Sequence, residues 1–485
     1  MVSRREVEER IKETLFALKR RLEENIRNNK ALWSDDSFGE GLQIRCEGLE
    51  AFLIPCLAWT PVHKPEDISN YLPIKTLKDE VNSVHKTVIE EGFVSTPYLY
   101  DRLEQEGIHP AEFIDTVSYA LTAMIHAREI LLQTGELDAD TDKKIIEVVN
   151  KGLKWMIDNH IPNGGWSGFP FKTVTHVYST WTAVECLWEI ERLVSRGAPD
   201  DTNRLFEEFK KCCLESKNWI VGFAKKQREI WVSDDGDLPT TGVIYNIYGL
   251  ATLLALDVEE EYPDIILKEI KSIIKRWRRR KEEFQRSTFH YFYLKREGSS
   301  ELLEIDYEDE SILILAISAL SEAATALKDR LPTEKLSSTE SLDNAVSRTL
   351  SEMFEALYDR FYKNGLWTDA SGRFSIYMTE RVLEALLAYA EYLGPPPMDL
   401  TQIGEKINTV IEAVGKVSRS GDEILGRLDA LDRRMSSIEA AVNEIKELFS
   451  KLEAKIVDKI VERARSGSEE IEAIERVKKH APKRK

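Results

Sequence analysis

The sequence has few of the residues that are abundant in collagen-like and low-complexity proteins. Its 485 residues include 24 glycines and 16 prolines, too few for a collagen-like or low-complexity chain. It contains no run of about 18 apolar residues, so we expect no membrane-spanning helix. The first twenty residues are charged throughout and lack the apolar segment of a secretory signal. With 42% hydrophobic residues, the chain should fold into a compact core.

Cysteine is also scarce, and the five cysteines form no CxxC pair. A disulfide framework or a structural zinc site requires closer or paired spacing. The sequence also contains none of the usual phosphate-binding, dinucleotide-binding or nucleophilic-serine motifs. We therefore expect reduced thiols, a cytoplasmic location, no metal and no cofactor. The cysteines are Cys46, Cys56, Cys186, Cys212 and Cys213.

The chain has fewer basic than acidic residues, and this imbalance is not spread evenly along the sequence. The formal net charge is −18. Residues 398–485 carry about +1, so the first 397 residues hold all of the excess acid. Binding to nucleic acid depends on clustered Lys and Arg that contact phosphates. A nucleic-acid partner is therefore not expected.

Three consecutive prolines, Pro395 to Pro397, divide the chain. Proline lacks a backbone donor and disfavours helix in the residue before it, so no helix should pass through this point. We predict a helical domain over residues 1–394, a proline linker over 395–399, a coiled coil over 400–460, and a charged, partly disordered tail over 461–485.

The coiled-coil prediction comes from a heptad repeat. With Leu400 as the first a position and Ile403 as the first d position, 16 of the 17 a and d residues up to Ile456 are apolar, and Gly421 is the exception. Because β-branched residues dominate at d, we expect a homo-oligomer through 400–456, a trimer or tetramer rather than a dimer. The alternative is a single amphipathic helix folded against the first domain.

The first domain shows helical segments separated by recurring aromatic turns. The turns carry Trp33, Phe93, Trp166, Trp231, Tyr293 and Trp367, at intervals of 60 to 74 residues, which indicates an internal repeat. The predicted helices are Arg5–Asn28, Gln43–Trp59, Pro110–Gln133, Lys143–His160, Thr175–Arg192, Asn203–Lys225, Thr241–Leu256, Ile265–Arg280, Glu308–Leu327, Asn344–Phe361 and Ser375–Leu393.

Each repeat reads as a polar helix, an aromatic turn and a more apolar helix. The second helices, such as those around residues 180, 250 and 315, are apolar on most faces and must be buried on most sides. Six amphipathic helices around six buried ones would form an all-α, six-hairpin α/α toroid.

Two segments carry a family resemblance. Residues 163–170 (NGGWSGFP) followed by 178–187 (YSTWTAVECL), and more weakly 364–367 (NGLW) with 377–386, resemble repeats of the terpenoid cyclase and protein prenyltransferase superfamily. The resemblance implies an α/α toroid. The sequence lacks the catalytic Asp-x-Asp-Asp motif of class II cyclases, and it lacks the Asp, Cys and His zinc ligands of prenyltransferases. The resemblance therefore does not imply either reaction for this chain.

The predicted inner helices begin with acidic or polar residues that a toroid would bring to one mouth of its cavity. The candidates for acid–base catalysis are Glu47, Asp115, Glu310, Glu380 and His176, and those for stacking against a ligand are Trp166, Tyr178, Trp181, Trp231 and Trp367. Paired carboxylates in such a place suit a glycosidase or lyase. Acids also favour the first turn of any helix, and aromatics at repeat turns also serve packing.

Two functions follow. The first is a non-enzymatic binding or scaffold protein, with a small molecule or protein in the toroid and several copies joined by the coiled coil. The alternative is an enzyme that acts on a carbohydrate or isoprenoid-like substrate through acids at the cavity mouth. The basic run Lys275–Lys281 is either a solvated helix face or a contact for an acidic partner.

Overall fold

The computed structural model describes most of the first 394 residues, and the chain divides into two compact units, Met1–Pro396 and Pro397–Lys485. The predicted linker lies outside the described residues, as do the coiled coil and the tail apart from six isolated positions, so these remain predictions. Described are residues 2–28, 30, 32–33, 36, 41–58, 71–94, 112–167, 175–227, 232–234, 239–241, 243–284, 287–295, 302–368 and 372–394, with 443, 446, 447, 450, 451 and 455.

One set of helices in the first unit is amphipathic. In α1, a reciprocal capping box between Ser3 and Glu6 starts the helix, and apolar residues recur every three or four positions on its buried face. The opposite face is charged and exposed, so these helices form an outer layer. They are α1 (Arg4–Arg27), α4 (Ile74–Glu91), α7 (Ala139–Asp158), α10 (Asp200–Lys226), α13 (Pro263–Arg279) and α16 (Leu342–Phe361).

A second set is buried on most sides. Nearly every residue of α6 from Ile114 to Leu131 is buried, as the apolar sequence predicts. These helices form an inner layer that alternates with the first set along the chain. They are α2 (Leu42–Ala58), α6 (Ile114–Gln133), α8 (Val177–Glu185) with α9 (Leu187–Ser195), α11 (Val243–Ala255), α15 (Ile312–Ala326) and α17 (Ile376–Tyr392).

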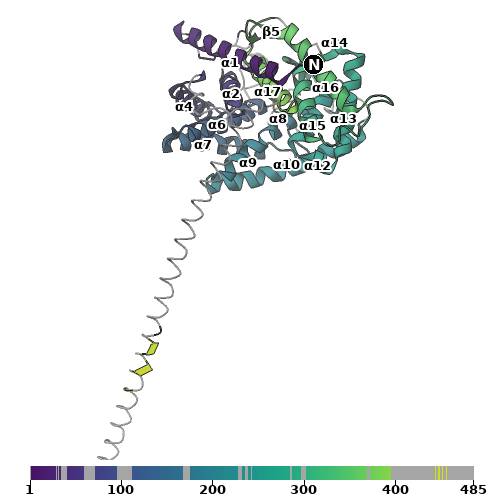
Figure 1. Cartoon of the computed structure of the whole chain (residues 1–485). Helices are drawn as coiled ribbons and strands as arrows, with labels where there is room; N and C mark the ends of the chain where they lie inside the picture. The colour runs from purple at the N-terminus through teal and green to yellow at the C-terminus, as the bar shows by residue number, and fades with distance from the viewer. Residues whose placement is uncertain are drawn as a thin grey trace, which may run out of the picture. The chain divides into compact units, whose positions relative to one another are not determined.

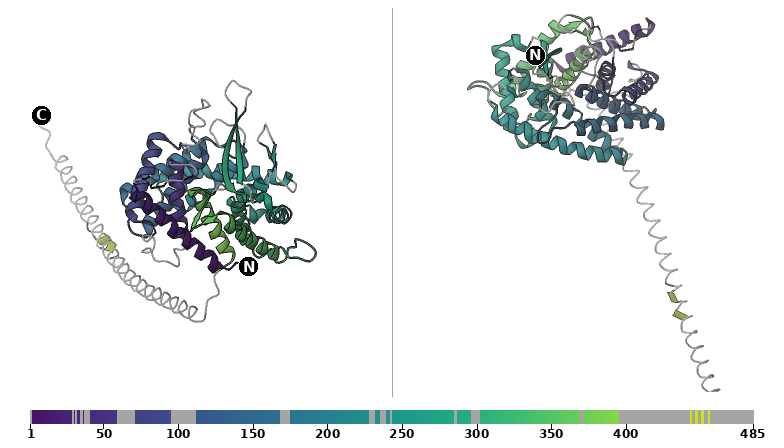
Figure 2. Two further views of the ribbon diagram at one scale, coloured as in Figure 1. Left: turned by 90° about the horizontal axis from the view of Figure 1, so that it is seen from above. Right: turned by 180° about the vertical axis from the view of Figure 1, so that it is seen from behind.

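The inner helices contact one another in a closed order. Helix α2 packs against α6, α6 against α8, α8 against α11, α11 against α15, α15 against α17, and α17 against α2. Figures 1 and 2 show the inner helices near the middle of this unit and α1, α7, α10 and α13 at its periphery. The predicted α/α toroid is therefore confirmed as a mainly helical architecture. Two short helices, α12 (Val258–Glu261) and α14 (Lys281–Phe284), follow inner helix α11 and outer helix α13.

The all-α prediction was incomplete, because three two-stranded antiparallel sheets join helices in the described part of the chain. The predicted helix from Glu308 begins at Ile312 instead, so Glu310 lies in a strand. Its segment pairs with an aromatic-rich partner, and such residues favour extended backbone. The hairpin stands clear of the helices in the left view of Figure 2. The pairs are β1 (Val232–Asp234) with β2 (Pro239–Thr241), β3 (Ser287–Lys295) with β4 (Leu302–Ser311), and β5 (Tyr362–Lys363) with β6 (Leu366–Trp367).

Two further differences concern helices. Helix α4 was not predicted, although Leu77, Val81, Val84 and Val88 have helical spacing. The predicted helix from Thr175 to Arg192 is interrupted at Cys186, which ends α8 and precedes α9. Among the described helices, none is long and apolar enough to cross a membrane.

Trp367 links the last hairpin of the ring to the first helix. Its side chain is fully buried, and its indole N–H donates to Thr14 Oγ1 at 3.1 Å across 353 residues of sequence. The ring in this unit is therefore closed by packing between the two ends of the domain.

We predict that Trp367→Ala lowers the free energy of unfolding by about 3–5 kcal/mol, because it removes the largest side chain at this closure and leaves a cavity. The matched control is Trp188→Ala, whose side chain is 53% exposed. It should change stability by about 0.5 kcal/mol at most. Urea denaturation followed by circular dichroism measures both, and equal effects of the two changes would refute the closure role.

Candidate functional site

The centre of the helical ring holds two adjoining cavities. The smaller has a volume of about 300 Å³ and the larger about 630 Å³. Both are lined by Ile54, Glu185, Glu189, Arg381 and Glu384, so the two cavities share part of one wall. Helices α2, α6, α8, α9, α11, α15 and α17 all contribute to the walls. The cavities are therefore a product of the ring as a whole.

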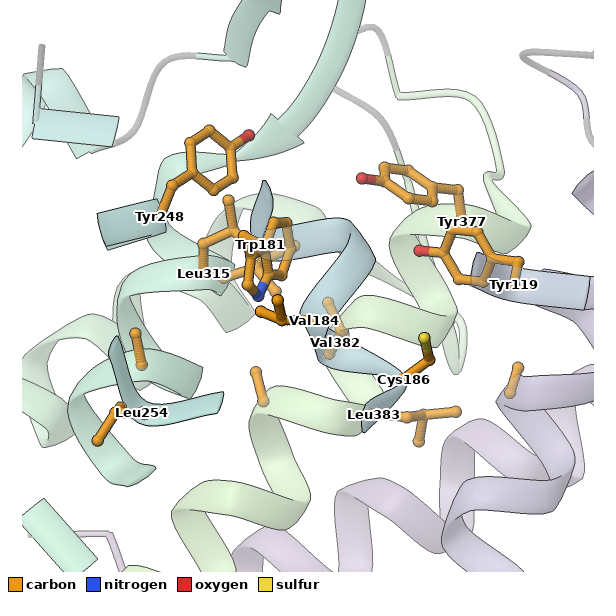
Figure 3. Close-up of a cluster of buried hydrophobic side chains, with 14 of the residues drawn as sticks. Tyr119, Trp181, Val184, Cys186, Tyr248, Leu254, Leu315, Tyr377, Val382 and Leu383 are labelled. Atoms are coloured by element: carbon orange, nitrogen blue, oxygen red, sulfur yellow. The ribbon is translucent and has the colours of Figure 1, made fainter. Parts of the chain in front are cut away.

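The cavities run along much of the length of the inner helices. Ile314 and Leu315 lie in the first turn of α15, whereas Leu57, Ala255 and Glu391 each lie at or next to the last residue of their helix. Aromatic rings form part of the wall. Figure 3 shows Trp181 between Tyr248 and the pair Tyr119 and Tyr377. The space therefore extends to the helix ends opposite to the helix starts at which the sequence led us to expect a mouth.

Arg381 on α17 is the central cation of the site. Its side chain is buried, and Nη1 donates to Glu185 Oε1 and to Glu384 Oε2, both at 2.8 Å. Its guanidinium lies 4.9 Å from the ring centroid of Trp181 and 5.1 Å from that of Tyr119. Burial by itself would lower the pKa of Arg381, but the adjacent carboxylates raise that pKa well above its usual value. The charge is therefore permanent.

His126 on α6 joins two more acids. Its Nδ1 lies 2.7 Å from Glu50 Oε2, and its Nε2 lies 3.0 Å from Glu189 Oε2. Burial opposes the charged imidazole, but the two carboxylates outweigh burial and raise the pKa of His126 to about 10. An imidazolium therefore lies between the carboxylates, hydrogen-bonded to Glu50 through Nδ1 and ion-paired with Glu189 through Nε2. Burial raises the pKa of Glu50, whereas His126 and Arg192 hold the pKa of Glu189 below its usual range despite burial.

Glu322 on α15 is a cavity acid whose pKa lies near neutral pH. Its side chain borders the larger cavity and accepts a hydrogen bond from Ser318 Oγ at 2.8 Å. The Glu322 side chain is accessible to solvent from the cavity, and the protein around this cavity raises the pKa of Glu322 to about 7, with the nearby carboxylates of Glu384, Glu185 and Glu391 adding to the shift. Glu322 can therefore give or take a proton near neutral pH.

The acidic residues predicted from the sequence occupy different places. Glu380 borders the smaller cavity, with its Oε2 3.4 Å from the Tyr119 hydroxyl. Glu47 is buried and accepts from Gln43 Nε2 at 2.8 Å, and Asp115 accepts from the Tyr178 hydroxyl at 2.8 Å. Glu47 and Asp115 therefore accept hydrogen bonds within the inner layer.

Other predicted residues are spread over the domain. His176 precedes α8, half-buried, with its ring 6.2 Å from that of Tyr245. Trp181 stacks on Tyr248 with ring centroids 5.2 Å apart and borders the larger cavity. Trp166, like Trp367, is fully buried and donates to a backbone or side-chain oxygen, so packing accounts for both. Trp231 and the side chain of Glu310 lie outside what the structure describes.

Sequence reasoning overlooked most of the charged wall. The sequence did contain a signal, because α15 is almost wholly apolar yet carries the acid Glu322. A charged side chain in the middle of such a helix must face a partner or a cavity. The overlooked residues are Glu50, His126, Glu185, Glu189, Arg192, Glu322 and Glu384. Within the described ranges, no three His, Cys, Asp or Glu side chains are arranged to hold a metal ion.

We predict that His126→Gln lowers the free energy of unfolding by about 3–5 kcal/mol, because it leaves Glu50 as an uncompensated buried charge. The folded protein holds the His126 proton up to a pH of about 10, whereas the unfolded chain loses it near its pKa of about 6.5. The stabilisation is therefore complete below about 6.5 and lost as pH rises toward 10. Urea denaturation across this range should give a steeper fall for the original protein than for the variant.

The control for this change is His85→Gln. His85 Nε2 pairs with Glu147 at 2.7 Å, but that carboxylate is 43% exposed. Its loss should cost about 1 kcal/mol or less. An equal pH dependence of the His126 variant and the original protein would contradict the bridging role.

Comparison with known proteins shows similarity in fold alone. No family model matches the sequence, and no curated protein matches it. A family 76 glycoside hydrolase (mannosidase) from Bacteroides thetaiotaomicron is 14% identical, with a TM-score of 0.38 over 71% of this chain and 85% of that one. A cellobiose 2-epimerase from Bacillus thermoamylovorans is 12% identical, with a TM-score of 0.39 over 73% and 88%. These values identify neither a family nor an activity.

Proposed function

We propose that the helical domain is an enzyme that cleaves a carbohydrate by acid–base catalysis in its central cavity. The observation that carries the proposal is Glu322, which has a pKa of about 7 and shares the larger cavity with Glu384, a carboxylate paired with Arg381. Cleavage of a glycosidic bond requires one carboxylic acid to protonate the leaving oxygen and a second carboxylate to activate water or attack the sugar. Glu322 and Glu384 would take these two roles.

The composition of the wall supports a sugar rather than an isoprenoid. Ionised groups in an enclosed site need hydrogen-bonding partners, and a hydrocarbon chain supplies none. A sugar offers hydroxyl groups to the carboxylates and an apolar face to aromatic rings. Trp188, which is exposed at the larger cavity, provides such a ring. The cyclase and prenyltransferase resemblance therefore stays a prediction about the repeats and does not extend to the substrate.

We predict that Glu322→Gln lowers kcat about 10²- to 10⁴-fold, because the amide cannot transfer the proton. Hydrolysis of a panel of 4-nitrophenyl glycosides and disaccharides, followed by released nitrophenolate and by NMR, measures this loss. In the original protein, kcat should fall as pH rises above about 7, since Glu322 then loses its proton. Glu90→Gln, an exposed acid on α4, is the control and should keep full activity. No turnover of any substrate in the panel would refute the enzyme proposal.

The second candidate is the scaffold function, which the heptad repeat of residues 400–456 favours. We infer from the alternation of outer and inner helices that the first domain is a six-hairpin toroid, and a coiled coil would present several copies of it. The five cysteines are free thiols, and they support a cytoplasmic location.

We predict that the full chain sediments as a trimer or tetramer, because β-branched residues dominate the d positions. A chain that ends at Gly394 should sediment as a monomer at the same concentration. Sedimentation equilibrium distinguishes the two states. A monomeric full chain would refute the oligomer and, with it, the scaffold function.

A further inference from the structure

The larger cavity ends where several inner helices have their C-terminal turns. Ala255 is the last residue of α11, Glu391 is the penultimate residue of α17, and Glu322 is in the last turns of α15. The carbonyl groups of such turns carry partial negative charge, which favours a cation nearby. Natural helices often place Lys or Arg there, but the last turns of α11, α15 and α17 contain no basic residue. This end of the cavity is therefore negative through its backbone alone.

The side chains add to this negative charge. Among the wall residues, the cationic groups are already committed to acids. Arg381 is paired with Glu185 and Glu384, and His126 with Glu50 and Glu189. Arg192 also binds Glu189, and Arg4 binds Glu8 at 2.7 Å.

Two wall acids remain without such compensation. In the described part of the chain, no Lys, Arg or His nitrogen lies within 4.0 Å of a carboxylate oxygen of Glu322 or Glu391. Glu391 is exposed to solvent, and its carboxylate is among the nearby groups that raise the pKa of Glu322. This end of the cavity therefore carries a carboxylate without a paired cation in addition to the helix ends.

Aromatic surface is available beside these charges. Trp188 borders the same cavity and is 53% exposed, although it is among the largest apolar side chains. An exposed indole face attracts a cation through its ring electrons and also stacks on the apolar face of a sugar. A carboxylate, helix C-termini and an indole in one mouth form a suitable environment for an ammonium group attached to a carbohydrate.

We infer that this mouth selects a substrate that bears a positively charged amine, namely an amino sugar, with Glu391 as its ammonium partner. The inference rests on the proposed carbohydrate function and specifies its substrate class. Glu322 keeps its role as the acid, because the amine pairs with the neighbouring carboxylate. The carboxylate of Glu391 and the C-termini of the helices also repel the carboxylate of an acidic sugar.

The test compares matched sugars that differ in one substituent. Binding of glucosamine, glucose and glucuronic acid, and of galactosamine and galactose, to the full chain is measured by titration with NMR detection. We expect each amino sugar to bind at least about tenfold more tightly than its parent hexose, and glucuronic acid to bind most weakly. Glu391→Gln should reduce the preference to about threefold or less while glucose binding is unchanged. Glu90→Gln should leave every affinity unchanged.

The outcomes separate the two proposals. Equal binding of the amino sugars and their parent hexoses would overturn the amine inference and leave the carbohydrate function standing. An undiminished preference in a Glu391→Gln protein that retains its melting temperature would overturn the assignment of the ammonium partner. Absence of binding by all five sugars would overturn both proposals.

Discussion

The shared ion pairs of Arg381 are the interaction on which the rest of the cavity depends. A buried guanidinium is tolerated only when carboxylates and polarisable surfaces replace its water. Glu185 from α8 and Glu384 from α17 supply the charge, and the rings of Tyr119 and Trp181 cover the faces. These groups come from three inner helices, so one cation links the walls of the ring. It also lets the wall carry more acid than the interior of a helical protein could otherwise hold.

A ring of inner helices has a centre that side chains fill only in part. Aromatic residues such as Tyr178 and Tyr248 pack against one another toward the N-terminal ends of these helices. Elsewhere along the inner helices, smaller and charged residues leave an open volume. Because the same helices supply the packed aromatic side chains and the acids, the packing that stabilises the domain also positions the acids.

Some acids of the cavity wall are paired with a cation and others are not, and this difference determines the chemistry that each acid can perform. His126 and Arg381 bind most of the acids strongly, which makes those groups structural. Glu322 has only a serine hydroxyl as a described hydrogen-bonding partner, so enclosure and neighbouring charges leave its proton affinity near neutral. A protein that paired every acid would be more stable at this point but would have no group able to exchange a proton. The proposed reactivity and the proposed selectivity for amines both arise from this local excess of negative charge.

The sequence by itself determined the helical architecture, because the period of apolar residues decides which face of each helix is buried. It also placed Asp115 in the first turn of an inner helix, although the helix predicted from Pro110 begins at Ile114, and it indicated the helix start beside His176 and the turns at Trp166 and Trp367. It did not indicate that residues 302–311 form a strand, because that depends on pairing with a second strand. Only the tertiary structure decided the site. Glu50 and His126 are 76 residues apart, and Glu185 and Arg381 are 196 apart. Which acids meet a cation, and which remain to exchange protons, depends on how the ring closes and not on any local pattern.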